Sequence, residues 1–135
     1  MTAKQYLSQA IQLDRRIRAK RADIKRLRDL ACSVSGSSGD HVGHAGVSDR
    51  VGSSAAKIAD LEAEIDADIR RYTELHREIA AVIDSVPDAR YAELLTLRYL
   101  CGETWERIAV GMNYSYRRVL QLHGFALQAV ERRLH

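Results

Sequence analysis

The feature that most constrains the fold is a pair of short amphipathic segments near the end of the chain, at residues 104–127. Thr104 suits the cap position before a first helix, Asn113 tolerates the left-handed conformation of a tight turn, and Ser115 suits the cap of a second helix. The pattern predicts a helix-turn-helix, which lays its second helix in the DNA major groove. The positions expected to face inward are Trp105, Ile108, Ala109, Met112, Val119, Leu122, Ala126 and Val130.

The second of these helices is expected at residues 116–133, with its polar groups opposite the apolar stripe. Arginine favours the guanine edge and glutamine the adenine edge, so this face is suited to reading bases. The expected base contacts are Tyr116, Arg117, Leu120 and Gln121, and the expected phosphate contacts are Ser115 and Arg118. A bare helical hairpin would produce the same apolar pattern. The DNA hypothesis therefore depends on the caps, the turn residue and the small Ala109 occurring together.

Two long polar helices are expected before this segment, at residues 3–34 and 53–86. In both, apolar residues recur at spacings of three and four, as in a coiled-coil seam, and neither helix is stable without a partner for its stripe. The first seam contains Ala10, Leu13, Ile17, Ile24, Leu27, Ala31 and Val34, and the second contains Ile58, Leu61, Ile65, Tyr72, Leu75, Ile79, Val82 and Val86.

One charged residue interrupts each seam, Lys20 in the first and Asp68 in the second. If the helices fold back as an antiparallel hairpin that aligns Ile24 with Leu61, the two charges lie one layer apart. We expect them to pair, which fixes the register at some cost in stability. The alternative is that both side chains extend to solvent.

The Gly/Ser-rich stretch at residues 35–52 is expected to be a loop between the long helices. Its His41 and His44 have no Cys or carboxylate set beside them, so we expect no metal site there. Pro87 should end the second helix and Asp88 should begin a third, at residues 89–101.

Three further residues near the helix-turn-helix have expected roles. Gly102 is expected to cap the C-terminus of the third helix. Arg98 in that helix is either a phosphate contact or a plain surface charge. Gly124, inside the last helix, suggests a close backbone approach to another helix or to DNA.

Composition and charge favour a helical intracellular protein of one or two small domains, divided at 1–86 and 87–135. Nine Lys/Arg against three Asp/Glu make residues 1–34 basic, whereas four against eight make residues 53–86 acidic. Cys32 and Cys101 suggest reduced core thiols of a cytoplasmic protein. No signal peptide or membrane span is expected. We also expect no enzyme, no catalytic residue and no cofactor, because no phosphate-cradling glycine loop or nucleophile motif occurs.

The segments TWERIA, GMNYS and YRRVLQLHGFALQAVERRL are similar to region 4 of bacterial sigma factors. Over nearly its whole length the chain resembles a phage and prophage family of sigma factors and late-gene regulators of the ArpU/RinA type, through KQYLSQAIQLDRRI, DRVGSSAAKIADLEAEI and LRYLCGETWERIAVGMNYSYRRVLQLHG. The resemblance implies a transcription regulator of double-stranded DNA, with RNA polymerase as a second partner. Arg107 and Leu120 depart from the sigma pattern, at a capping position and at a DNA-facing position.

Two other functions fit the same sequence. Small terminase subunits of phages also join a helix-turn-helix to long helices and assemble into rings for DNA packaging. A protein-binding adaptor of RNA polymerase is the other alternative, because the net charge of +3 is modest for a DNA-binding protein. In each case the helical hairpin is a candidate surface for homo-oligomer formation.

Overall fold

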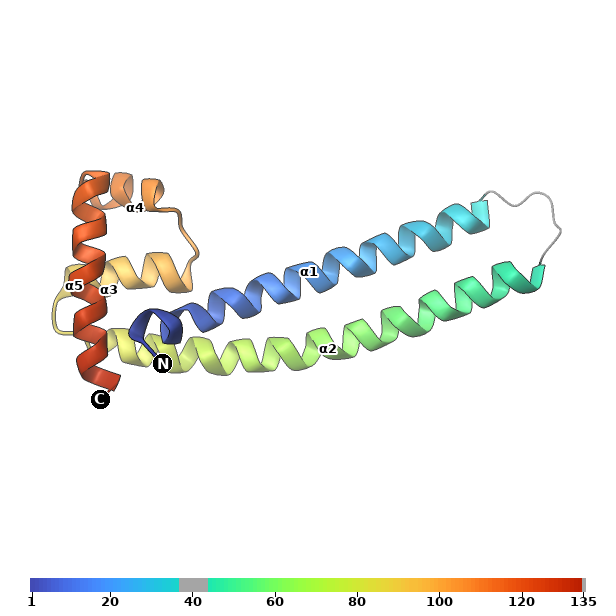
Figure 1. Ribbon diagram of the computed structural model, residues 1–135, viewed down its shortest axis with the longest axis horizontal. Helices are drawn as coiled ribbons and strands as arrows, with labels where there is room; N and C mark the ends of the chain where they lie inside the picture. Colours follow the sequence, from blue (N-terminus) through green and yellow to red (C-terminus); the bar gives the residue numbers. More distant parts are fainter. Residues whose placement is uncertain (37–43, 135) are drawn as a thin grey trace. The chain divides into compact units, whose positions relative to one another are not determined.

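The computed structural model describes the backbone of residues 1–36 and 44–134 and the side chains of residues 1–33 and 52–134. Every regular element in these residues is a helix and none is a strand, which confirms the predicted all-α class. The elements are α1 (Ala3–Gly36), α2 (His44–Asp84), α3 (Ala89–Leu95), the π-helical turn η2 (Thr96–Leu100), α4 (Trp105–Met112) and α5 (Tyr116–Leu134) (Figure 1).

The chain divides into two compact units, each formed by segments that are distant in the sequence. Unit 1 comprises Met1–Asp14 and Arg71–His135, and unit 2 comprises Arg15–Arg70. The long helices α1 and α2 each contribute to both units. The sequence-based division between residues 86 and 87 falls inside unit 1, so the first turns of α1 and the last turns of α2 share a unit with the helix-turn-helix.

Unit 1 has one hydrophobic core, to which five helical segments contribute. Leu7 of α1 and Ile83 of α2 are 0% exposed, and they belong to the same cluster as Val119 and Leu122 of α5. The start of α1 is also held by a hydrogen bond, since the Ala3 amide donates to Glu131 Oε2 at 2.7 Å. The core therefore joins α5 to both long helices. The other large side chains that are fully buried in it are those of Ile79, Leu94, Leu95, Ile108 and Val130.

The α3–η2 segment begins and ends as its sequence predicts, although its last turn is wider than an α-helix. Asp88 caps α3 by accepting a hydrogen bond from the Arg90 amide, and the Arg90 side chain holds the pKa of Asp88 below its usual value. The turn η2 ends with Cys101 N–H donating to the Thr96 carbonyl, five residues earlier. Gly102 then adopts φ 70°, so it is the left-handed residue that terminates the segment.

In unit 2 the two helices run antiparallel, and their register is marked by ion pairs. Lys20 Nζ lies 2.6 Å from Asp68 Oδ2, with both side chains about one-seventh exposed (13% and 14%). Arg28, further along α1, pairs with Glu62, which is earlier in α2. The predicted Lys20–Asp68 pair is therefore confirmed, and the alternative that both groups extend to solvent is wrong. Arg16 Nε also lies 3.5 Å from Asp68.

Two sequence-based expectations need correction, one about the bounds of the long helices and one about the cysteines. Helix α2 begins at His44 and not at residue 53, and α1 continues to Gly36; of the predicted loop, only residues 37–43 lie outside the described residues. Extending an existing helix through a few Gly and Ser residues costs much less than nucleating a new one, which accounts for the longer α2. Cys32 and Cys101 are both exposed, because they lie beside the apolar stripes and not within them.

Candidate nucleic-acid interface

Helix α4 and the turn after it are fixed by local hydrogen bonds. Thr104 caps α4, since its side chain accepts a hydrogen bond from the Arg107 amide at 3.2 Å. Asn113 has φ 61° and ψ 42°, the left-handed conformation that the sequence predicted for the turn. The Tyr114 amide donates back to the Ala109 carbonyl, which closes the turn. These bonds set the direction in which the chain enters α5.

Helix α5 separates its apolar and polar residues cleanly. The four predicted inward residues, Val119, Leu122, Ala126 and Val130, are each 0–1% exposed. The helix packs against α3 and α4 (Figure 1). All six candidate DNA-binding residues are exposed, and all lie at the cap or in the first two turns of α5. They are Ser115, Tyr116, Arg117, Arg118, Leu120 and Gln121. The fold therefore leaves this whole group open to solvent, and we call it the α5 outer face.

The α5 outer face is partly organised by hydrogen bonds of its own. The Ser115 hydroxyl accepts from the Arg118 amide at 3.1 Å, which makes it the N-terminal cap that the sequence predicted. Its hydroxyl hydrogen remains able to donate to a phosphate oxygen. The Arg118 guanidinium lies 3.4 Å from Gln121 Oε1, a weak contact one helical turn apart.

Arg117 is the most available charge on this face. In the described part of the chain, no carboxylate pairs with it and no hydrogen bond holds its side chain. The first turn of α5 contains no acidic residue either, so the positive end of the helix dipole is not offset there. An anionic or hydrogen-bonding ligand would meet no competing partner at Arg117.

Two exposed apolar side chains, one on α4 and one on α5, were not identified from the sequence. Val110 on α4 is 83% exposed and Phe125 on α5 is 49% exposed, while Leu120 is 41% exposed. Phe125 follows Arg117 and Gln121 at i+4 spacing, so it extends the α5 outer face by one turn. The i+4 count that placed Arg117 and Gln121 opposite the apolar stripe could have found it.

Behind α5, an aromatic cluster connects η2, α4 and α5. The Tyr99 hydroxyl is 2.6 Å from His123 Nε2, and the His123 and Trp105 rings are 4.5 Å apart. The Arg98 guanidinium lies 4.3 Å from the Trp105 ring centroid and donates to the Glu103 carbonyl. The Arg98 guanidinium is thus engaged within the fold and is not a plain surface charge, whereas a phosphate contact through its remaining N–H groups stays a prediction. His123 is the core-edge residue that its place beside the stripe predicted.

Burial makes the stability of unit 1 dependent on pH through His123. Burial first, and the nearby charges of Lys4 and Arg98 second, lower the pKa of His123 from 6.5 to about 4. The folded state therefore holds a neutral imidazole in the range where the unfolded state takes up a proton. The contribution of neutral His123 to the unfolding free energy is therefore fully present above pH 6.5, and it is lost as the pH falls toward 4.

We expect the wild-type unfolding free energy to drop by about 1 kcal/mol more between pH 7 and pH 5 than that of His123→Gln, because partial exposure of the imidazole to solvent weakens the full effect of the lowered pKa. Chemical denaturation followed by Trp fluorescence at each pH gives both values. Equal pH slopes in the two proteins would contradict a buried neutral His123. His76→Gln, at a half-buried histidine of α2, is the control.

Gly124 does not have the close helix contact that its position suggested. A Cβ at this glycine would meet no atom within 4 Å, so no described segment of the chain approaches it, and that expectation is wrong. The glycine is exposed and follows Tyr116 and Leu120 at i+4 spacing on the α5 outer face. An approach by DNA stays a prediction.

In the described residues there is no group of three or more His, Cys, Asp or Glu side chains placed to hold a metal ion. His41 and the side chain of His44 lie outside the described residues. None of the helices in the described part of the chain has the length and hydrophobicity needed to cross a membrane. No protein-family model, curated protein or solved structure matches this chain.

Proposed function

We propose that the protein is a DNA-binding transcription regulator that reads its site with the outer face of α5. The observation that carries the proposal is the exposure of all six candidate residues, five on α5 and Ser115 as its N-terminal cap, on a helix whose opposite stripe is buried. A capped helix with an arginine and a glutamine one turn apart, entered from a tight turn, suits the major groove. In this proposal Arg117 and Gln121 read base edges, while Ser115 and Arg118 hold phosphates.

The proposed regulator is of phage origin and works together with RNA polymerase. Support for this part comes from the resemblance of the helix-turn-helix segments to region 4 of sigma factors. The modest charge fits a protein that binds DNA as part of a larger complex, because phosphate contacts from polymerase then add to its own.

The first test is selection of bound sequences from a random pool of double-stranded DNA, with the full chain. The proposal expects an enriched motif, and binding to it that weakens steeply with salt. Arg117→Ala should then weaken binding to the selected site by about 1–3 kcal/mol and relax the preference at one base position. The measurement is a titration of wild type and variant against the selected site and against single-base variants.

The control is Arg133→Ala, which removes an equal charge from the last turn of α5. It should change affinity less and leave the base preferences intact. Equal weakening by Arg117→Ala on every DNA would make Arg117 a phosphate contact. No enriched motif together with a ring-sized mass would favour a packaging protein, and no salt-dependent binding at all would favour a protein-binding adaptor.

A further inference from the structure

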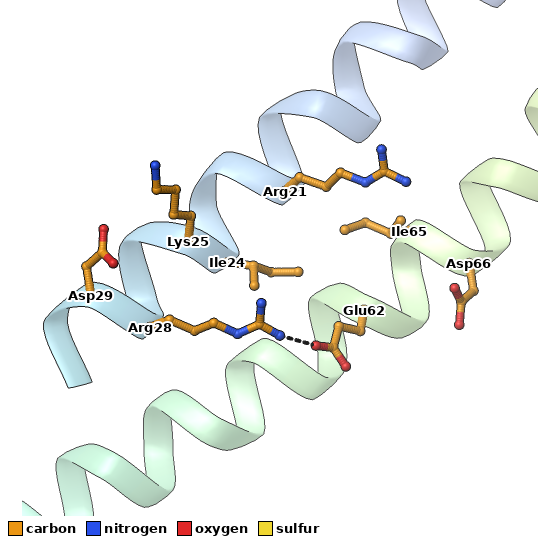
Figure 2. A pocket seen from close by; sticks show the side chains of 8 residues that line it. All are labelled: Arg21, Ile24, Lys25, Arg28, Asp29, Glu62, Ile65 and Asp66. Atoms are coloured by element: carbon orange, nitrogen blue, oxygen red, sulfur yellow. Dashed lines mark hydrogen bonds and ion pairs between the residues drawn. The ribbon is translucent and has the colours of Figure 1, made fainter. Parts of the chain in front are cut away.

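Unit 2 contains a groove between its two helices that is separate from the α5 outer face. Ile24 of α1 and Ile65 of α2 point toward one another at its base, and both are 6% exposed (Figure 2). Arg21, Lys25 and Arg28 line it from α1, and Glu62 and Asp66 line it from α2. One wall of the groove is therefore largely basic and the other is acidic; Asp29 is the exception on α1.

Each wall belongs to a second stripe that repeats along its helix with heptad spacing. On α1 the stripe contains Arg18, Arg21, Lys25, Arg28 and Cys32, and on α2 it contains Ala55, Ala59, Glu62, Asp66 and Ile69. Steps of three and four residues keep a stripe on one side of a helix, as the seam that joins α1 to α2 does. Ile69 is 37% exposed, and Ala55 and Ala59 are exposed and small enough to let another helix approach. The groove side of unit 2 has the pattern of a second helix-packing surface.

A pair of helices buries only one stripe on each, and pairing alone rarely stabilises two polar helices. Unit 2 has few fully buried side chains: among its described residues, only Ile17, Ile24 and Ile65 are buried. Four helices around a common core are a more stable arrangement, because each helix then buries two stripes. The opposite charges of the two walls indicate which two helices would complete such a four-helix arrangement.

We propose that the groove of unit 2 is covered by the same groove of a second copy of the chain. A two-fold axis parallel to the helices places α1 of one copy against α2 of the other, so basic and acidic walls meet. An axis across the helices would place α1 against α1, and the basic walls would repel each other. The charge pattern therefore selects the parallel axis.

The register of unit 2 extends this pairing to individual residues. Lys20 and Asp68 mark one level along the pair, and an axis parallel to the helices leaves levels unchanged. At that register Arg21 of one copy lies within one residue, about 1.5 Å along the axis, of Asp66 of the other, and Lys25 lies equally close to the level of Glu62. The same register places Arg28 opposite the small Ala59, which leaves room for its existing ion pair with Glu62. All five pairs of positions in the two second stripes show this same small offset of one residue, which long charged side chains can span.

The test is the mass of the full chain in solution, measured by sedimentation over a range of protein and salt concentrations. Wild type should approach twice the 15.2 kDa mass of the chain, and its dissociation constant should rise with salt. Arg21→Glu and Asp66→Arg should each weaken self-association about tenfold or more, because each places like charges opposite one another twice in a dimer. Mixing the two variants in equal amounts should restore a dimer, because both contacts again join opposite charges.

The matched controls are Arg26→Glu and Asp60→Arg, which make the same charge changes at exposed positions turned away from the groove. Both should dimerise like wild type. Monomeric wild type, dimerisation insensitive to Arg21→Glu, or a mixture that stays monomeric would each overturn the proposal. So would a loss of DNA binding in Arg21→Glu with no change in mass, since the basic wall would then belong to nucleic acid. Circular dichroism of each variant separates a lost interface from a lost fold.

Discussion

Leu7→Ala is expected to lower the free energy of unfolding of the helix-turn-helix by about 2–5 kcal/mol, although residue 7 lies more than ninety residues before that segment. Leu7 is 0% exposed and packs in one cluster with Val119 and Leu122. Its truncation leaves a cavity in the core that α1 shares with α5, which the surrounding helices fill only partly. The loss of unfolding free energy should affect every helix that contributes to this core, including α4 and α5.

Trp105 reports on this effect directly, since it is the only tryptophan of the chain and lies in α4. Chemical denaturation followed by its fluorescence should shift to lower denaturant for Leu7→Ala, together with the far-UV circular dichroism. Leu30→Ala, at a side chain 44% exposed in unit 2, should change the unfolding free energy by less than about 0.5 kcal/mol. An unchanged Trp105 transition in Leu7→Ala would mean that residues 87–135 fold independently of α1.

The sequence was most informative where structure depends on neighbouring residues. Each of the cap and turn residues interacts only with groups a few residues away along the chain. The predicted conformation or hydrogen bond is present for Thr104, Asn113 and Ser115. The Lys20–Asp68 pair was also predictable over a longer range, because a single charge in each apolar seam has one favourable partner. Helical periodicity likewise identified the buried and exposed sides of α5.

The remaining features depend on contacts that no local pattern encodes. The core that contains both Leu7 of α1 and Val119 of α5, and the hydrogen bond from the Ala3 amide to Glu131, join opposite ends of the chain. The contact between Tyr99 and His123 depends on how η2 and α5 cross. The widened turn of η2 corresponds to no local pattern in the sequence. For the candidate interface, helical periodicity predicted which residues are exposed. The ligand of these residues depends on the charge and shape of the whole surface, which periodicity does not encode.

Lys20→Met is the second substitution with a large expected effect, a loss of about 2–3 kcal/mol in the unfolding free energy of the α1–α2 pair. Its ammonium group lies 2.6 Å from Asp68 in the seam, and the two side chains are 13% and 14% exposed. Removing the lysine leaves a poorly solvated carboxylate, and among the residues whose side chains are described only the more exposed Arg16, 3.5 Å away, remains to offset it. Denaturation followed by far-UV circular dichroism measures the loss.

Replacing both partners, as in Lys20→Met/Asp68→Leu, should recover most of this loss, because an apolar pair fills the seam without an unpaired charge. Arg28→Met, which removes an ion pair whose side chains are 61% and 53% exposed, should cost less than about 1 kcal/mol. If the double variant is as unstable as Lys20→Met, the pair contributes to stability directly. If it is stable but populates shifted pairings of α1 and α2, detectable as mixed distances between spin labels on the two helices, the pair sets the register. The second outcome is expected, because an apolar seam alone permits α1 and α2 to slide by one heptad, whereas a single buried charge on each helix favours one alignment.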